Sequence, residues 1–146
     1  MVAKNIARHL LHYHMAQSSI TVRVEPDFNW EECVVRVDLR AVSPDVIEGL
    51  EAMVTSWYKV GALGGYRDID RAYTSVSTLK PEEATEINYL GSFNWDGKHV
   101  EFFVDLGSAG DVAIDILLNL ILAFSVKNGN VVRRVWIGFP GIEEKE

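Results

Sequence analysis

Hydrophobic and polar residues alternate along two stretches of the chain in the way that half-buried β-strands require. Every second residue is apolar over residues 19–25, and the same alternation returns over residues 34–41. The polar positions of the second stretch are charged and include Arg36, Asp38 and Arg40. The pattern therefore predicts two strands, of which the second has one apolar face and one ionic face.

A helix is predicted directly after the second strand. Ser43 and Pro44 match an N-cap followed by proline at the first helical position, and Val42 with Ile47 can form a hydrophobic staple. Gly61 follows as the expected C-cap. Between these ends, apolar residues recur at the 3.6-residue helical period: Val46, Ile47, Leu50, Met53, Val54, Trp57 and Tyr58.

The second half of the chain repeats the order of strand and helix. A hairpin is indicated by Asp96-Gly97, because this pair supplies the positive φ angles that a tight turn needs. Ser108 and Asp111 match a Ser-x-x-acid capping box at the start of a second helix. The expected elements are hairpin strands over residues 87–93 and 98–106, a helix from 108 to about 127 and a last strand over 131–139.

The predicted order of elements is typical of one fold class. Phe28-Asn29-Trp30 recurs as Phe93-Asn94-Trp95, and a strand followed by a helix comes after each copy. The order strand, helix, strand, strand, helix, strand is the ferredoxin-like split βαβ arrangement, here with an extra N-terminal strand. We therefore expect an α+β domain over residues 19–140, with both helices on one face of the sheet. Residues 1–18 are expected to form an N-terminal helix or flexible segment, and residues 141–146 an acidic tail.

Composition narrows the classes of function. The chain has 146 residues, 48% of them hydrophobic, which is enough for one core. Its net charge of −7 has the wrong sign for binding phosphate backbones, so no nucleic-acid partner is expected. The longest nearly apolar run, residues 113–124, is shorter than the roughly 20 residues that cross a bilayer, which predicts a buried helix and no membrane partner. Because Cys33 is the single cysteine, nothing indicates secretion, and a cytoplasmic location is expected.

Two aspartates occupy corresponding places before the two helices. If their strands are adjacent, parallel and central, Asp38 and Asp105 lie at the same end of the sheet and can bind Mg²⁺ or Mn²⁺. The alternative is cross-strand ion pairing, since Arg36 and Arg40 project from the same face as Glu101. Ion pairing is favoured because no third metal ligand is evident, so no cofactor is predicted. An enzyme that depends on a metal or binds a small ligand is the alternative function.

A glycine-rich loop follows the first helix. Gly61, Gly64, Gly65 and Tyr66 are its candidate residues, since glycine-rich loops can bind phosphate. However, the loop follows a helix C-terminus, where the macrodipole is negative, and it lacks the Lys-Ser/Thr pair of a P-loop. Helix capping and a tight turn are therefore the favoured interpretation.

The second helix is apolar on nearly all sides. Asp111, Asp115 and Asn119 form only a narrow polar stripe, so one face of a sheet cannot cover the whole helix. Either the N-terminal helix or a second subunit would cover the rest. The absence of a catalytic constellation favours a non-enzymatic module that forms a homodimer and binds a protein partner. The candidate interface residues are Leu117, Leu118, Ile121 and Phe124.

Two segments resemble a known family. They are residues 56–66, Ser-Trp-Tyr-Lys-Val-Gly-Ala-Leu-Gly-Gly-Tyr, and residues 104–108, Val-Asp-Leu-Gly-Ser, which lead into residues 114–117. They resemble an uncharacterised domain-of-unknown-function family of cyanobacteria and plant plastids, and the likeness spans about residues 34 to 138. The chain departs from the family pattern at residues 67–70. The resemblance implies a cytoplasmic or stromal protein of a photosynthetic lineage and carries no established activity.

Overall fold

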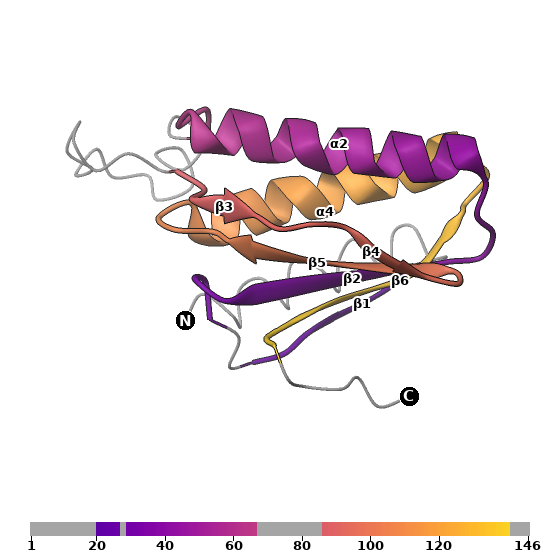
Figure 1. The fold of residues 1–146 in the computed structure, drawn as a ribbon, viewed down its shortest axis with the longest axis horizontal. Helices are drawn as coiled ribbons and strands as arrows, with labels where there is room; N and C mark the ends of the chain where they lie inside the picture. The colour runs from indigo at the N-terminus through magenta and orange to yellow at the C-terminus, as the bar shows by residue number, and fades with distance from the viewer. Residues whose placement is uncertain (1–19, 27–28, 67–85, 141–146) are drawn as a thin grey trace.

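The computed structural model describes residues 20–26, 29–66 and 86–140. The predicted N-terminal segment and the acidic tail lie outside these residues. Two helices lie together on one face of a single sheet (Figure 1). The elements in chain order are β1 (Thr21–Val24), β2 (Cys33–Leu39), α2 (Pro44–Ala62), β3 (Tyr89–Leu90), β4 (Asn94–Asp96), β5 (His99–Asp105), α4 (Gly110–Lys127) and β6 (Val132–Gly138).

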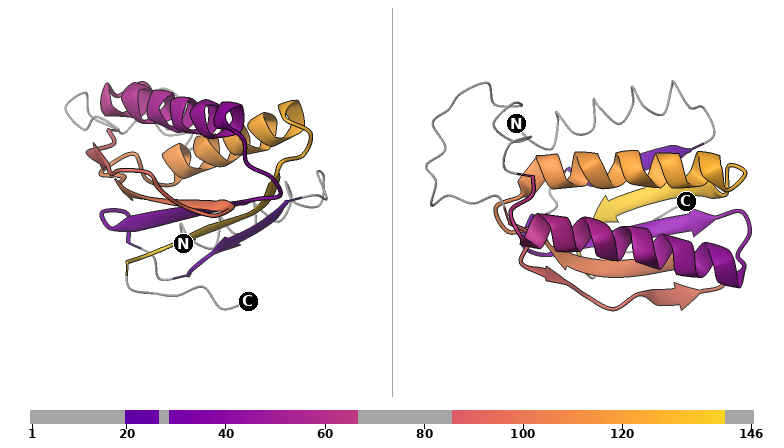
Figure 2. Two further views of the ribbon diagram at one scale, coloured as in Figure 1. Left: turned by 45° about the vertical axis from the view of Figure 1, so that its right-hand side comes forward. Right: turned by 90° about the horizontal axis from the view of Figure 1, so that it is seen from above.

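The sheet has the strand order β1-β6-β2-β5-β3, and β4 also pairs with β5. β1 runs parallel to β6, whereas all the other strand pairs are antiparallel. Seen from above, α2 and α4 lie side by side and run in opposite directions (Figure 2). The predicted α+β class and the placement of both helices on one face are confirmed, and the strand order does not conflict with a ferredoxin-like arrangement.

The local signal at the start of α2 works as predicted, and the predicted hairpin forms with its turn shifted towards the C-terminus. The Ser43 hydroxyl accepts a hydrogen bond from the Val46 N–H at 3.2 Å, which caps α2. In the hairpin, Asp96 ends β4 and pairs with His99, so Gly97 and Lys98 form the loop. Gly97 has a φ of +60°, whereas Asp96 does not have the positive φ that the sequence predicted for it. A glycine at the first central position of a two-residue loop is what a type II′ turn needs. These turns are set by neighbouring residues, so short-range sequence is sufficient to predict them.

The predicted capping box of the second helix is wrong. α4 begins at Gly110 with Ala109 in the N-cap position, and no side chain caps it by a hydrogen bond. The Ser108 hydroxyl instead accepts a hydrogen bond from the Glu86 N–H at 3.1 Å. A long-range contact therefore takes the group that the local pattern assigns to the helix end.

The core lies between the sheet and the two helices. The inward-facing strand residues Val35, Val37 and Phe102 are almost fully buried, and the indole N–H of Trp57 on α2 donates to the Ala113 carbonyl of α4 at 2.8 Å. The core also includes three of the predicted interface residues, namely Leu117, Leu118 and Ile121, which are 0, 2 and 1% exposed. These three side chains are covered within a single chain, while Phe124 is only partly buried.

Candidate functional site

The two aspartates that were expected to form one site lie at opposite ends of a strand pair. β2 and β5 are neighbours, as predicted, but they run antiparallel, with Asp38 opposite His99. Asp105 stands at the other end of β5, roughly 20 Å away at about 3.4 Å per residue. The prediction of parallel strands is wrong, and with it the prediction that Asp38 and Asp105 hold one Mg²⁺ or Mn²⁺ together.

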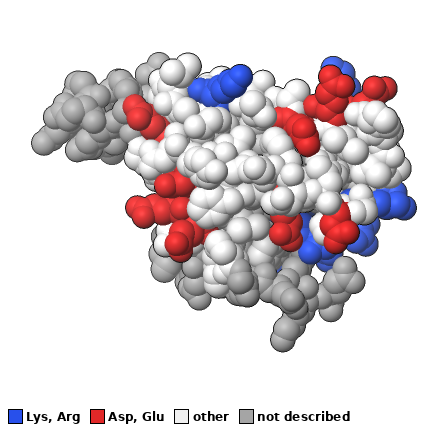
Figure 3. Space-filling model, viewed as in Figure 1, with Lys and Arg blue, Asp and Glu red and all other residues white. Residues whose placement is uncertain are grey.

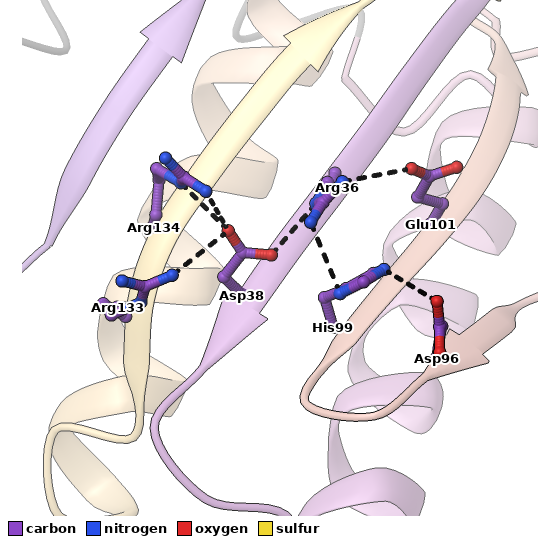
Figure 4. Close-up of polar contacts among 7 residues, drawn as sticks. All are labelled: Arg36, Asp38, Asp96, His99, Glu101, Arg133 and Arg134. Carbon is purple, nitrogen blue, oxygen red and sulfur yellow. Dashed lines mark hydrogen bonds and ion pairs between the residues drawn. The ribbon is translucent and has the colours of Figure 1, made fainter. Parts of the chain in front are cut away.

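Asp38 is the centre of an ionic network on the face of the sheet opposite the helices (Figure 4). Arg36 Nε donates to its Oδ1 at 3.0 Å, and Arg134 Nε donates to its Oδ2 at 2.9 Å, with Arg134 Nη2 in an ion pair 2.8 Å from the same oxygen. Arg133 Nη2 lies 3.9 Å from the same Oδ2. Arg36 Nη1 also lies 3.7 Å from Glu101 Oε1. Cross-strand ion pairing, the favoured interpretation of the sequence, is therefore what the structure contains.

The charge state of Asp38 follows from these contacts. Burial by itself raises the pKa of Asp38, but the hydrogen bonds and positive charges of Arg36 and Arg134 outweigh it and lower that pKa below its usual value. The carboxylate is ionised at neutral pH and its oxygens accept from guanidinium groups. This environment does not fit Mg²⁺ or Mn²⁺, which need several oxygen ligands and are repelled by the arginines. Among the described residues, no group of three or more His, Cys, Asp or Glu side chains could hold a metal.

A depression of about 480 Å³ opens beside Asp38, and we call it the basic pocket. Its lining residues are Arg36, Asp38, Leu39, Arg40, Lys98, His99 and Arg133. The β2–β6 register shifts between Asp38 and Leu39, and such a bulge re-aims the side chains that follow it. The Arg40 N–H donates to the Val131 carbonyl, and its Nη1 donates to the Val132 carbonyl at 3.0 Å. The bulged end of β2 is thus fixed against β6.

The basic pocket is cationic in a protein whose net charge is −7. Arg36, Arg40, Lys98 and Arg133 line it, against the single carboxylate of Asp38. The largest group of lysine and arginine atoms in Figure 3 lies at the lower right of the molecule, with some acidic atoms beside it and others spread over the rest of that face. Lys98 forms no ion pair with another described residue, and the Arg133 side chain is 56% exposed.

His99 belongs to the same network. Its Nδ1 lies 3.4 Å from Arg36 Nη2, and its Nε2 lies 3.8 Å from Asp96 Oδ2 (Figure 4). A neutral imidazole with an unprotonated Nδ1 accepts a hydrogen bond from Arg36 in this arrangement. His99 therefore connects the β4–β5 hairpin to the arginine that holds Asp38.

The glycine-rich segment ends α2 and does not form a phosphate loop. The helix continues through Gly61 to a C-cap at Leu63, so the predicted C-cap is two residues too early. Gly64 has a φ of +77°, and its N–H donates to the Gly61 carbonyl at 3.0 Å. The Gly65 N–H donates to the Val60 carbonyl at 2.9 Å, which completes a Schellman motif. These glycines have a structural role that the helix end requires.

Gly61 and Tyr66 pack this segment into the core. A Cβ on Gly61 would lie 2.3 Å from Ile87 Cδ1, and the Ile87 N–H donates to the Gly61 carbonyl at 3.1 Å. The Tyr66 hydroxyl donates to the Trp57 carbonyl at 2.7 Å, and burial raises the pKa of Tyr66 to about 12. Close packing explains why a glycine and a tyrosine occupy these positions.

The second segment that resembles the family, residues 104–108, also contacts residues 86–88. The Ser108 N–H donates to the Glu86 carbonyl at 3.2 Å, and Asp105 Oδ1 accepts from the Gly107 N–H at 2.9 Å. Gly107 has a φ of +53°, and a Cβ there would lie 2.6 Å from the Glu86 carbonyl oxygen. Asn88 Nδ2 lies 3.5 Å from Asp105 Oδ1. Asp105 therefore supports a turn, and both motifs converge on residues 86–88.

Three residues of this site were not among the candidates predicted from the sequence: Lys98, Arg133 and Arg134. The one available hint was the adjacent pair Arg133-Arg134 at the start of the last strand of an acidic protein. Arg133 and Arg134 reach the site only because of the β2–β6 register, which places Arg134 opposite Asp38. That register is a tertiary property.

Comparisons with known proteins place the chain in a family. Neither the curated proteins nor the solved structures include a match to it. None of the helices in the described part of the chain is long and apolar enough to cross a membrane. The family model described as "Protein of unknown function (DUF3531)" matches residues 21–144, which confirms the expected uncharacterised family. The cyanobacterial or plastid origin stays a prediction. The chain belongs to the DUF3531 family of proteins of unknown function.

Proposed function

We propose that this domain binds an anionic small molecule in the basic pocket. The observation that carries the proposal is the charge imbalance there: four cationic side chains line the pocket with one carboxylate, that of Asp38, and Glu101 pairs with Arg36 beside it. Both oxygens of that carboxylate already accept hydrogen bonds from Arg36 and Arg134. An excess of positive charge confined to one place in an acidic protein attracts anions, and arginine is well suited to bind carboxylate and phosphate groups.

The rigidity of the pocket supports the proposal. Its cations come from two neighbouring strands and a turn, with Arg133 on β6, Arg36 on β2 and Lys98 in the β4–β5 turn. The Leu39 N–H donates to the Lys98 carbonyl at 2.7 Å, so the turn is tied to the bulged end of β2. The backbone that carries these cations is therefore fixed before a ligand arrives, which reduces the entropy lost on binding.

The proposal includes binding and no chemical step. Cys33 is fully buried, and burial raises the pKa of its thiol to about 12, so it is not a nucleophile at neutral pH. The alternative function inferred from the sequence was an enzyme that binds a metal or a small ligand at Asp38 and Asp105. From that alternative we retain a small ligand that binds beside Asp38, and we do not retain the metal or Asp105. We also propose a cytoplasmic location, as expected from the sequence, because phosphorylated metabolites are abundant in the cytoplasm.

A thermal-melt titration with inorganic phosphate tests the proposal. Phosphate at 100 times its Kd should stabilise the protein by about 2.7 kcal/mol, which raises the Tm by roughly 5 to 10 °C. Arg133→Gln and Lys98→Gln should reduce the shift, whereas Lys59→Gln removes the same charge at the end of α2 and should leave it unchanged. No shift, or an equal reduction in all three variants, would contradict the proposal.

A second candidate function is self-association, with a second copy of this chain as the partner. The observation that favours it is an apolar groove of about 450 Å³ between α2 and α4. Its lining residues are Asp45, Gly49, Met53, Leu120, Ala123, Phe124, Lys127 and Asn128. In a two-fold symmetric pair, Asp45 of one copy can face Lys127 of the other, which gives charge complementarity around an apolar centre.

Sedimentation equilibrium tests this second candidate. Ala123→Glu places a charge in the groove and should make a dimer monomeric. Ala52→Glu places the same charge on an exposed position of α2 outside the groove, and it should sediment like the wild type. A wild type that is monomeric at all concentrations, or a dimer that survives Ala123→Glu, would exclude this interface.

A further inference from the structure

Asp38 divides the basic pocket into two parts. In Figure 4 its carboxylate lies on the central strand β2, with Arg133 and Arg134 on one side and His99 on the other. Arg133 lines the pocket from β6, and we call its position the β6 lobe. Lys98 and His99 line the pocket from the β4–β5 hairpin, and we call their position the β5 lobe.

The central carboxylate keeps other anions away from the middle of the pocket. Two like charges in contact repel each other, and the repulsion is stronger where burial lowers the effective dielectric constant. The Asp38 side chain is 6% exposed and its oxygens already accept from Arg36 and Arg134. An anionic group is therefore most stable on either flank of Asp38, near Arg133 or near Lys98, where the exposed cations lie.

The separation of the lobes sets the size of the ligand. β6 and β5 are the two neighbours of β2, so their backbones are roughly 10 Å apart. One phosphate group reaches only one lobe, whereas a molecule with two anionic groups can bind both. The described lining residues include no Phe, Tyr or Trp on which a nucleobase could stack. Charge, and not stacking, is therefore the basis of recognition.

We infer that the ligand carries at least two phosphate groups on a non-aromatic framework and binds with one group in each lobe, on either side of Asp38. This inference rests on the proposed function and specifies the class of ligand. A short polyphosphate and a sugar bisphosphate share this chemistry. Once one group is bound, the second binds as an intramolecular partner, which raises the affinity beyond that of either contact alone.

Isothermal titration calorimetry with the full chain tests the inference. The probes are inorganic phosphate, tripolyphosphate, a sugar bisphosphate and ATP, all at one fixed ionic strength because charge contacts are screened by salt. Tripolyphosphate or the sugar bisphosphate should bind at least about tenfold more tightly than phosphate. ATP, which adds a base and a ribose to a triphosphate, should bind no more tightly than tripolyphosphate.

Single substitutions separate two-lobe binding from a general charge effect. Lys98→Gln and Arg133→Gln should each reduce the affinity for the tighter probe to about that for phosphate, because each removes one lobe. Lys59→Gln lowers the net charge equally but lies outside the pocket, so it should change the affinity less than about twofold. Both pocket side chains are exposed, and unchanged melting temperatures of the ligand-free variants confirm that they fold.

The possible outcomes distinguish this inference from the proposed function. If phosphate binds in a way that depends on the pocket and no probe with two phosphates binds more tightly, the two-lobe inference is wrong and the proposed function stands. If no anion binds, both are wrong. Equal losses in Lys59→Gln and the pocket variants would show a general charge effect and overturn the inference. If ATP binds more tightly than tripolyphosphate, the inference that the ligand has a non-aromatic framework is wrong.

Discussion

Replacing Asp38 by asparagine should destabilise the protein through the loss of one buried charge. The substitution keeps the shape of the side chain but turns one carboxylate oxygen into an NH₂ group. That group would face the N–H donors of Arg36 or Arg134, which now donate to Oδ1 at 3.0 Å and to Oδ2 at 2.9 Å. At least one guanidinium thus loses a close acceptor while it remains partly buried, although Arg36 keeps its contacts with His99 and Glu101.

The expected size of the effect follows from the burial of the partners. Removing one partner of a fully buried ion pair costs about 3 to 5 kcal/mol. The side chains of Arg36 and Arg134 are 24% and 17% exposed, so water can solvate them in part. We therefore expect the lower end of that range, about 3 kcal/mol in the free energy of unfolding. Asp96→Asn is the matched control, because Asp96 is 89% exposed and should change stability by less than about 0.5 kcal/mol.

Urea unfolding at several pH values measures both the size and the origin of the effect. The pKa of Asp38 is lowered in the folded state, so its contribution is fully present above its unfolded pKa of about 3.9 and is lost as the pH falls through the folded value. The difference between wild type and Asp38→Asn should accordingly be constant near neutral pH and shrink in acid. A difference below about 1 kcal/mol at pH 7, or one that does not shrink in acid, would refute the reasoning.

Three further predictions concern the motif segments and the cysteine. Gly61→Ala should lower the free energy of unfolding in urea by about 1 to 3 kcal/mol, because the added Cβ would meet Ile87 Cδ1 at 2.3 Å. Ile87→Val removes that Cδ1 and should partly reverse the loss, whereas additive effects of the two substitutions would contradict this contact. Tyr66→Phe should cost about 1 kcal/mol, since it removes the buried hydrogen bond from the tyrosine hydroxyl to the Trp57 carbonyl, and an unchanged unfolding midpoint would exclude that role. The thiol of Cys33, buried and with a pKa of about 12, should react with a thiol reagent only at the rate of unfolding, and fast labelling of the native protein would show otherwise.

Short-range patterns in the sequence were sufficient to predict most of the elements. Ser43 starts α2 and Gly97 allows the hairpin turn, because a cap and a tight turn depend on residues within a few positions. Alternation correctly gave β2 an apolar and an ionic face. The same reasoning was wrong at Ser108, where Glu86 returns from elsewhere in the chain and uses the hydroxyl that the local pattern had assigned to a helix end. At Gly61 it placed the C-cap two residues too early, because Gly64 has the positive φ that ends α2.

Only the tertiary structure decided which charged residues meet. Alternation shows which face of a strand a residue occupies, but it does not show which way the neighbouring strand runs or how the two are aligned. The antiparallel β2–β5 pair separates Asp38 from Asp105, and the β2–β6 register places Arg134 against Asp38. Residues nearly a hundred positions apart thereby form the basic pocket. Their contact is set by strand pairing over long range, and for that reason a single sequence predicted the elements of this protein but not its candidate site.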